Sequence, residues 1–172
     1  EIDEQDFMDR ARLLCSLGQT VLISNFQEYY KLVEYFSLYS RKRMVLSMGV
    51  NNLIDIFDHK YYQHLSGGIL EAFSKLFHKD LKVYLYPMIS DDGTLITSEN
   101  LKVHPRMKEL YKFFKYTGKL VDIKNYNPEI LNIFSRKVLK MINSGEKGWE
   151  PLLPTVVSNM IKEKQLFGFS EK

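Results

Sequence analysis

Cysteine is nearly absent from this sequence, since Cys15 is the only one among 172 residues. A single cysteine cannot form a disulfide within the chain or a cysteine-based zinc site, so neither crosslink contributes to the fold. Cys15 falls on the apolar stripe of a predicted helix, where we expect a buried thiol that packs as a small apolar side chain. At 172 residues the chain is long enough to bury a core without crosslinks.

Long apolar runs are also missing. No stretch has the roughly 20 consecutive apolar residues of a membrane-spanning helix, and no signal-peptide pattern opens the sequence. These absences predict a cytoplasmic protein that has no membrane partner.

A large excess of charge of one sign is missing too. The 24 Lys and Arg residues nearly balance the 21 Asp and Glu residues, for a net charge of +3 that is spread along the chain. The one dense basic run, Arg41-Lys42-Arg43, lies at a predicted turn, where it is typical of a solvated loop. The charge distribution gives no reason to expect a nucleic-acid partner, and we predict none.

Several enzyme motifs are absent from the sequence. It has no GxGxxG fingerprint, no Walker lysine loop and no GxSxG elbow. No two histidines stand at the i, i+4 helical spacing of zinc enzymes; the four are His59, His64, His78 and His104. The residues therefore identify no catalytic group, no metal site and no cofactor.

Short apolar segments alternate with helical patterns over the first two thirds of the chain. Strands are predicted at residues 21–23, 44–50, 82–89 and 120–123. The pair Asp92-Gly93 predicts a hairpin that returns through residues 94–97. Helices are predicted at about residues 6–17, 25–39, 51–57, 68–77, 105–117, 128–144 and 154–164.

Strands that alternate with helices favour a parallel sheet. We predict a three-layer, Rossmann-like α/β fold that has a mainly parallel sheet of three or four strands, helices on both faces and a helical C-terminal part. No repeat and no flexible linker divides the sequence, so residues 1–172 are expected to form a single domain.

The chain opens with Glu1 and has no initiator methionine, which favours the C-terminal domain of a longer protein. The remainder of that parent protein is then the first expected partner. Aromatic-rich helices are also compatible with a homo-oligomer.

Open α/β sheets bind ligands beyond the carboxyl ends of their strands. The small polar residues and the glycine at the predicted strand ends are therefore candidate ligand-binding residues: Ser24, Asn25, Gly49, Asn51 and Asn52. A purely structural alternative exists, because asparagine is also a preferred helix cap, and Asn25 and Asn51 precede predicted helices.

The tail of the chain resembles the C-terminal signature of nicotinate-mononucleotide adenylyltransferases. The resemblance is carried by residues 133–138 (Ile-Phe-Ser-Arg-Lys-Val), Gly145, Leu153-Pro154 and Leu166-Phe167. In that family, small hydroxyls and an arginine of the signature contact ATP phosphates, so the resemblance implies that Ser135 and Arg136 bind a nucleotide. Leu139 stands where the family has its arginine, and the family's His-x-Gly-His motif is absent, so any catalytic residues would lie upstream.

Over essentially its whole length, the chain also resembles the C-terminal region of a larger bacterial protein family that is common in Bacteroidetes. Members are labelled nicotinate-nucleotide adenylyltransferase or TonB-dependent receptor. The stretches that carry this resemblance are residues 6–11, 21–25, 61–62, 145–150, 161–164 and 166–169.

Two hypotheses of function follow. The first is an ancillary ligand-binding or assembly domain of a larger cytoplasmic bacterial protein, which is not catalytic alone. The second is a partial nucleotidyltransferase domain of the nicotinate-mononucleotide adenylyltransferase kind, active in NAD biosynthesis. Under the second hypothesis, a nucleotide is the expected ligand.

Overall fold

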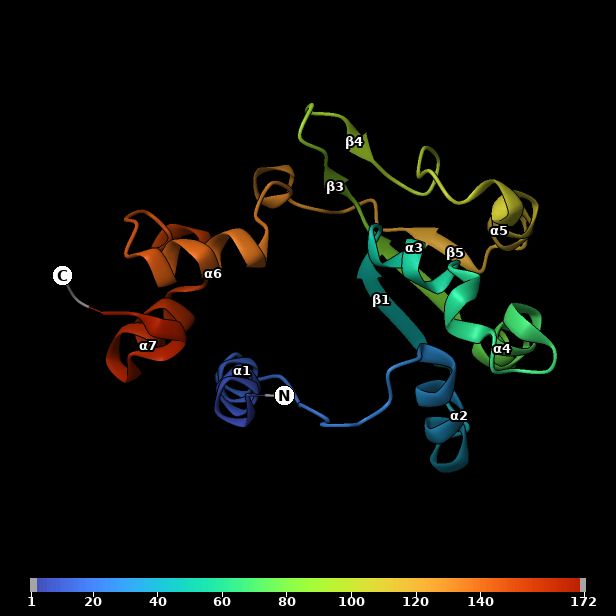
Figure 1. Cartoon of the computed structure of the whole chain (residues 1–172), viewed down its shortest axis with the longest axis horizontal. Helices are drawn as coiled ribbons and strands as arrows, with labels where there is room; N and C mark the ends of the chain where they lie inside the picture. The colour runs from blue at the N-terminus through green and yellow to red at the C-terminus, as the bar shows by residue number, and fades with distance from the viewer. Residues whose placement is uncertain (1–2, 171–172) are drawn as a thin grey trace. The chain divides into compact units, whose positions relative to one another are not determined.

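A computed structural model describes residues 3–170, and their contacts group into two compact units. Unit 1 consists of residues 3–24 together with residues 133–170, and unit 2 consists of residues 25–132 (Figure 1). Each unit has its own buried core. The sequence predicts a single domain, because no Gly- or Pro-rich stretch marks the two places where the chain passes from one unit to the other, at residues 24–25 and 132–133.

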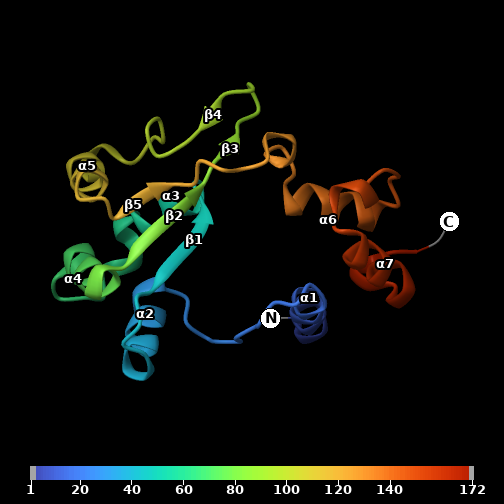
Figure 2. The same ribbon diagram turned by 180° about the vertical axis from the view of Figure 1, so that it is seen from behind.

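Unit 2 contains a parallel sheet with the strand order β1-β2-β5. Its elements are α2 (Tyr29–Tyr39), β1 (Val45–Gly49), α3 (Asn52–Ile56), α4 (Gly68–Leu76), β2 (Lys82–Tyr86), β3 (Met88–Ile89), β4 (Leu95–Ile96), α5 (Lys108–Tyr116) and β5 (Leu120–Asp122). The short 3-10 turns η1 (His59–Tyr62), η2 (His78–Asp80), η3 (Pro105–Met107) and η4 (Pro128–Ile130) connect them. The predicted hairpin is confirmed as the antiparallel pair β3 and β4, which projects beyond β2 in Figure 2.

The prediction of a strand at residues 21–23 is wrong. Residues 21–27 have no regular secondary structure, and Leu22 and Ile23 are 58% and 52% exposed. Three apolar residues are fewer than the five or six of a typical strand, and this run has no buried face to hold it. The helix predicted from residue 25 begins instead at Tyr29, with Glu28 rather than Asn25 at its N-cap.

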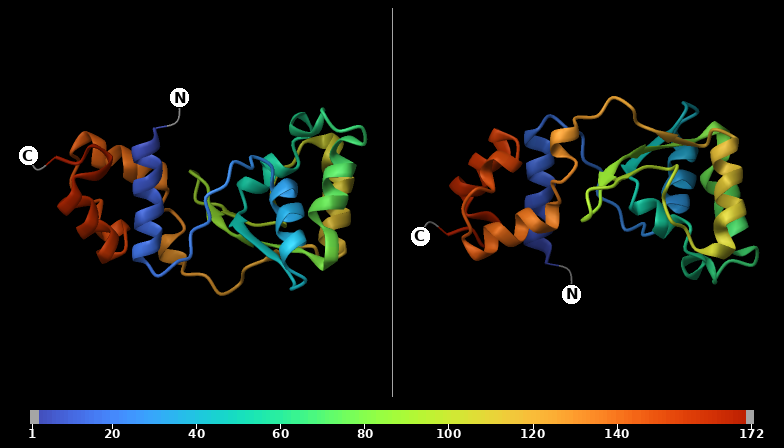
Figure 3. Two further views of the ribbon diagram at one scale, coloured as in Figure 1. Left: turned by 90° about the horizontal axis from the view of Figure 1, so that it is seen from below. Right: turned by 90° about the horizontal axis from the view of Figure 1, so that it is seen from above.

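One face of the sheet carries the core of unit 2. Along β2, Val83 and Leu85 are fully buried, whereas the alternate residues Tyr84 and Tyr86 are only half-buried. Figure 3 shows α2, α4 and α5 on the same side of the sheet. On β1, Val45 remains 50% exposed. The mixed α/β class with a parallel sheet is confirmed, but helices on both faces are not.

Unit 1 is helical, as predicted for the C-terminal part. It contains α1 (Glu4–Ser16), α6 (Ser135–Ser144) and α7 (Thr155–Lys164), with the turns η5 (Glu150–Leu152) and η6 (Leu166–Gly168). The helix predicted over residues 128–144 is divided into η4 and α6. The core of unit 1 consists of Leu13, Val138, Met141, Ile142, Trp149, Val157, Ile161 and Leu166.

Helix α1 packs through a face other than the predicted one. Its buried residues are Asp9 and Leu13, and Cys15 is exposed, so the expectation of a buried thiol is wrong. Apolar periodicity misses this face because the buried Asp9 is polar; its carboxylate accepts hydrogen bonds from Gln5 and Arg12. No helix within residues 3–170 has the length and apolar content needed to cross a membrane.

Candidate functional site

Three of the predicted ligand-binding residues lie together at the carboxyl end of β1. Gly49 ends the strand, Asn51 occupies the N-cap position of α3, and Asn52 is the first residue of that helix. The Asn51 side chain makes no capping hydrogen bond, so its predicted structural role is not what positions it. Its Oδ1 atom instead lies only 2.6 Å from where a Cβ on residue 49 would stand, so only glycine fits there without a shift.

Ser24 and Asn25 are not at a strand end, because the strand that was predicted to present them does not form. Both residues are exposed in the irregular segment before α2. Their proposed role in ligand binding stays a prediction.

A strand-end carboxylate that the sequence analysis missed lies at Asp122, the last residue of β5. It accepts hydrogen bonds from the backbone N–H and the hydroxyl of Ser98, at 3.0 and 2.7 Å. The Ser98 carbonyl in turn accepts from the Tyr111 hydroxyl at 2.7 Å. Burial, followed by the charges of Asp122 and Glu99, raises the pKa of Tyr111. Asp122 therefore secures the loop before α5 rather than presenting a free base.

The remaining two predicted residues, Ser135 and Arg136, form the first turn of α6 in unit 1. Phe134 holds the N-cap position and has no side-chain acceptor for the first N–H groups of the helix. The N-terminal turn of a helix carries partial positive charge, and here Arg136 and Lys137 are exposed beside it. The turn is suited to hold an anion.

An apolar groove of about 430 Å³ adjoins Ser135 within unit 1. It lies among α1, α6 and α7 and is lined by Arg10, Leu13, Leu14, Leu17, Ser135, Val138, Leu139, Ile142, Leu153, Pro154, Val157, Ile161 and Phe167. We call it the unit 1 groove. Its volume is within the range of small-molecule sites, which are mostly apolar with a few polar groups that fix orientation. Ser135 is the only uncharged polar residue of its lining.

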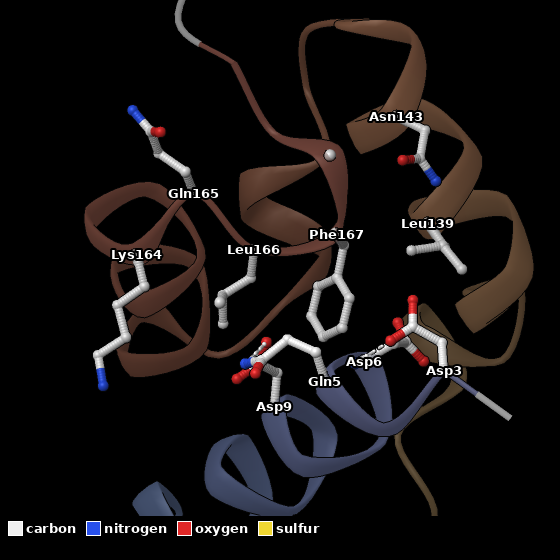
Figure 4. Close-up of a pocket in the computed structure, with 11 residues that line it drawn as sticks. Asp3, Gln5, Asp6, Asp9, Leu139, Asn143, Lys164, Gln165, Leu166 and Phe167 are labelled. Carbon is white, nitrogen blue, oxygen red and sulfur yellow. Dashed lines mark hydrogen bonds between the residues drawn. The ribbon is translucent and has the colours of Figure 1, made fainter.

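A second, polar pocket of unit 1 lies between the first turns of α1 and the segment 164–168. In Figure 4, Leu166 and Phe167 point toward α1, which contributes Asp3, Gln5, Asp6 and Asp9. The carboxylates of this pocket are engaged within α1. Asp3 accepts from the Asp6 backbone N–H as the N-cap, and Asp6 pairs with Arg10 at 2.6 Å.

Asp9 is engaged as well. The hydrogen bond from Gln5, helped by Arg12, lowers the pKa of the Asp9 carboxyl. The three acids of the polar pocket, Asp3, Asp6 and Asp9, are therefore all hydrogen-bonded within the first turns of α1.

The histidines provide no metal centre in the part of the chain that the structure describes, where no three His, Cys, Asp or Glu residues are grouped to hold an ion. Nε2 of His64 lies 3.1 Å from the Tyr30 hydroxyl, and Nδ1 of His104 accepts from the Arg106 backbone N–H. Both histidines thus have structural contacts.

Comparisons with known proteins found no match. No family model, no curated protein and no solved structure is similar to this chain at a significant level. The geometry of its two units is therefore the basis for any functional proposal.

Proposed function

We propose that this chain is an ancillary ligand-binding domain of a larger cytoplasmic bacterial protein and has no catalytic activity alone. The observation that carries the proposal is the unit 1 groove, which combines apolar walls with the first turn of α6 at Ser135. Asp9 in unit 1 and Asp122 at the end of β5 are already hydrogen-bonded within the chain. A binding role fits this arrangement better than a catalytic one.

The ligand that suits this groove has an apolar ring and a negatively charged group. The ring would lie against Leu139 and Pro154, and the anion would reach the Ser135 hydroxyl and the N–H groups of the first turn. Arg136 is exposed on the same turn and would add a charge-assisted hydrogen bond. Nucleotides have both features.

A partial nucleotidyltransferase is the second candidate. It is favoured by one specific observation, which is that Ser135 and Arg136 of the adenylyltransferase-like tail stand together at a helix N-terminus beside an apolar groove. Catalytic residues would then come from elsewhere in the parent protein. Under this second proposal, another part of the parent protein would cover the sheet face that holds the half-exposed Val45, and so complete a three-layer, Rossmann-like fold.

Calorimetric titration of the chain with ATP, NAD and nicotinate mononucleotide tests the binding proposal, with adenosine as the ligand that lacks phosphate. We expect a nucleotide to bind at least tenfold more tightly than adenosine. Ser135→Ala and Arg136→Ala should remove most of that difference, and Leu14→Glu, at a half-exposed position of the groove, should abolish binding. Arg41→Ala, an exposed arginine of unit 2, is the matched control.

The outcomes separate the candidates. If no nucleotide binds to a chain that circular dichroism shows to be folded, the groove is refuted as a nucleotide site. Binding of nicotinate mononucleotide that persists under saturating ATP would favour the transferase, since a transferase must hold both substrates. If ATP and nicotinate mononucleotide displace each other, they share one site, and the result would favour the ancillary binding domain over the transferase.

A further inference from the structure

Unit 2 contains a separate cavity of about 290 Å³ that the proposed function does not use. The residues just before α2, the end of α3 and the turn η1 enclose it. Its walls hold three tyrosine rings and two carboxylates, those of Tyr29, Tyr61, Tyr62, Glu28 and Asp55. We call it the tyrosine cavity.

The rings of the tyrosine cavity differ in their exposure. Tyr62 is 6% exposed and fixed, because its hydroxyl donates to the Ile56 carbonyl at 2.9 Å. Tyr29 and Tyr61 are 36% and 43% exposed and border the opening. The Lys60 ammonium, which pairs with Asp58 at 2.7 Å, also lies 4.7 Å from the centroid of the Tyr61 ring, so this ring can contact a cation. Tyrosine faces attract positive charge because their π electrons are concentrated there.

The charge of the cavity wall is negative. None of the residues that line the tyrosine cavity is basic. The Glu28 side chain is only 18% exposed and pairs at 2.8 Å with Lys31, which lies outside the lining. Asp55 forms no ion pair with any residue of the described chain. Burial is the main cause that raises the pKa of Tyr62, followed by the charge of Glu28, with smaller contributions from Tyr30, Asp58 and Asp55. A ligand in this cavity therefore meets tyrosine rings and the unpaired carboxylate of Asp55, whereas Lys31 balances the charge of Glu28.

From this combination we propose that the tyrosine cavity binds a small organic cation, of the quaternary ammonium or alkylated amine class. The methyl groups of such a cation pack on the faces of Tyr29 and Tyr61, and its charge is balanced by Asp55. A hard metal ion fits less well, because it needs several oxygen ligands, and the described residues place no three suitable groups together. This site is independent of the unit 1 groove.

Choline is a suitable probe, and 3,3-dimethyl-1-butanol is its neutral counterpart of the same shape. We expect calorimetry on the full chain at constant ionic strength to show choline binding at least tenfold more tightly than the alcohol. Tyr61→Leu and Asp55→Asn should each weaken choline binding by roughly threefold to tenfold. Tyr61→Phe keeps the aromatic face and should retain most of the affinity.

The controls are matched to the two substitutions. Tyr116→Leu changes a tyrosine that is 93% exposed, and Asp91→Asn changes an exposed aspartate in the hairpin turn; neither should alter choline binding. Equal affinity for choline and the alcohol would overturn the proposal, because the cavity would then be only an apolar slot. Absence of choline binding in the folded chain would overturn it too. A third result would also overturn the proposal: calcium chloride displaces choline, and Tyr61→Leu leaves the affinity for choline unchanged. That result would identify a carboxylate metal site.

Discussion

The Asp122 carboxylate offers the sharpest test of the structure of unit 2. Asp122→Asn preserves the shape of the side chain but removes its charge. The amide oxygen can still accept from one of the two Ser98 donors, while the amide nitrogen faces the other donor. Ser98 is 3% exposed, so water replaces the lost bond poorly.

The magnitude follows from these two bonds. A hydrogen bond to a charged group stabilises a protein by about 1.5–3 kcal/mol, and a neutral one by about 1 kcal/mol. Asp122 is half-buried, so the lower end of the range applies to it. One charged bond becomes neutral and the other is lost, so we expect the free energy of unfolding to fall by about 2 kcal/mol.

Urea denaturation followed by circular dichroism measures this change. With a slope of about 2 kcal/mol per M for a protein of this size, the midpoint should move by roughly 1 M. Asp91→Asn, at an exposed turn residue, should leave the midpoint in place. A midpoint for Asp122→Asn within about 0.2 M of the wild type would refute the role assigned to Asp122. Amide exchange at Ser98 provides a local check, since its N–H should lose protection in the variant.

Two further predictions concern a carboxyl group and a glycine. Hydrogen bonds from Ser90, and then from Thr94, lower the pKa of Asp92 to about 2. The hydrogen bonds of Asp92 should therefore stabilise the hairpin fully at pH values above the ordinary pKa of aspartate, and this contribution should be lost as the pH falls through about 2. Ser90→Ala should raise the pKa of Asp92, as measured in a carbon-13 NMR titration. Gly168→Ala should destabilise the chain by about 1–2 kcal/mol in urea, because Gly168 has φ +75° and a Cβ there would collide with Asn143. Gly93 has φ +83° but open space around its Cβ position, so Gly93→Ala should lower the free energy of unfolding by less. An equal loss of stability in the two variants would refute the collision with Asn143.

Much of unit 2 was predictable because its signals are local. The apolar run of residues 44–50 and the alternation along β2 identify strands, and Asp92-Gly93 identifies a hairpin. In unit 1 a local signal also holds, since Gly145 follows the last residue of α6 in the left-handed conformation at φ +68°. These features depend on residues within a few positions of one another, which a single sequence displays directly.

The candidate sites were less predictable because they join distant residues. Ser98 and Asp122 are 24 positions apart, so no spacing rule connects them. The unit 1 groove brings Leu13 of α1 beside Val138 and Ile161. The sequence assigns no site to Tyr61 and Tyr62, and their convergence with Glu28 and Asp55 is a property of the fold.

The carboxylates of this chain differ in how they are hydrogen-bonded. A general base must keep a lone pair free and close to the proton that it removes. Asp9, Asp92 and Asp122 each accept two hydrogen bonds within the chain, which fix the positions of these carboxylates. Asp55 has no ion pair in the described residues, and it lines the tyrosine cavity. Asp55 is therefore positioned to balance the charge of a cation in the tyrosine cavity, and Asp55→Asn tests that role.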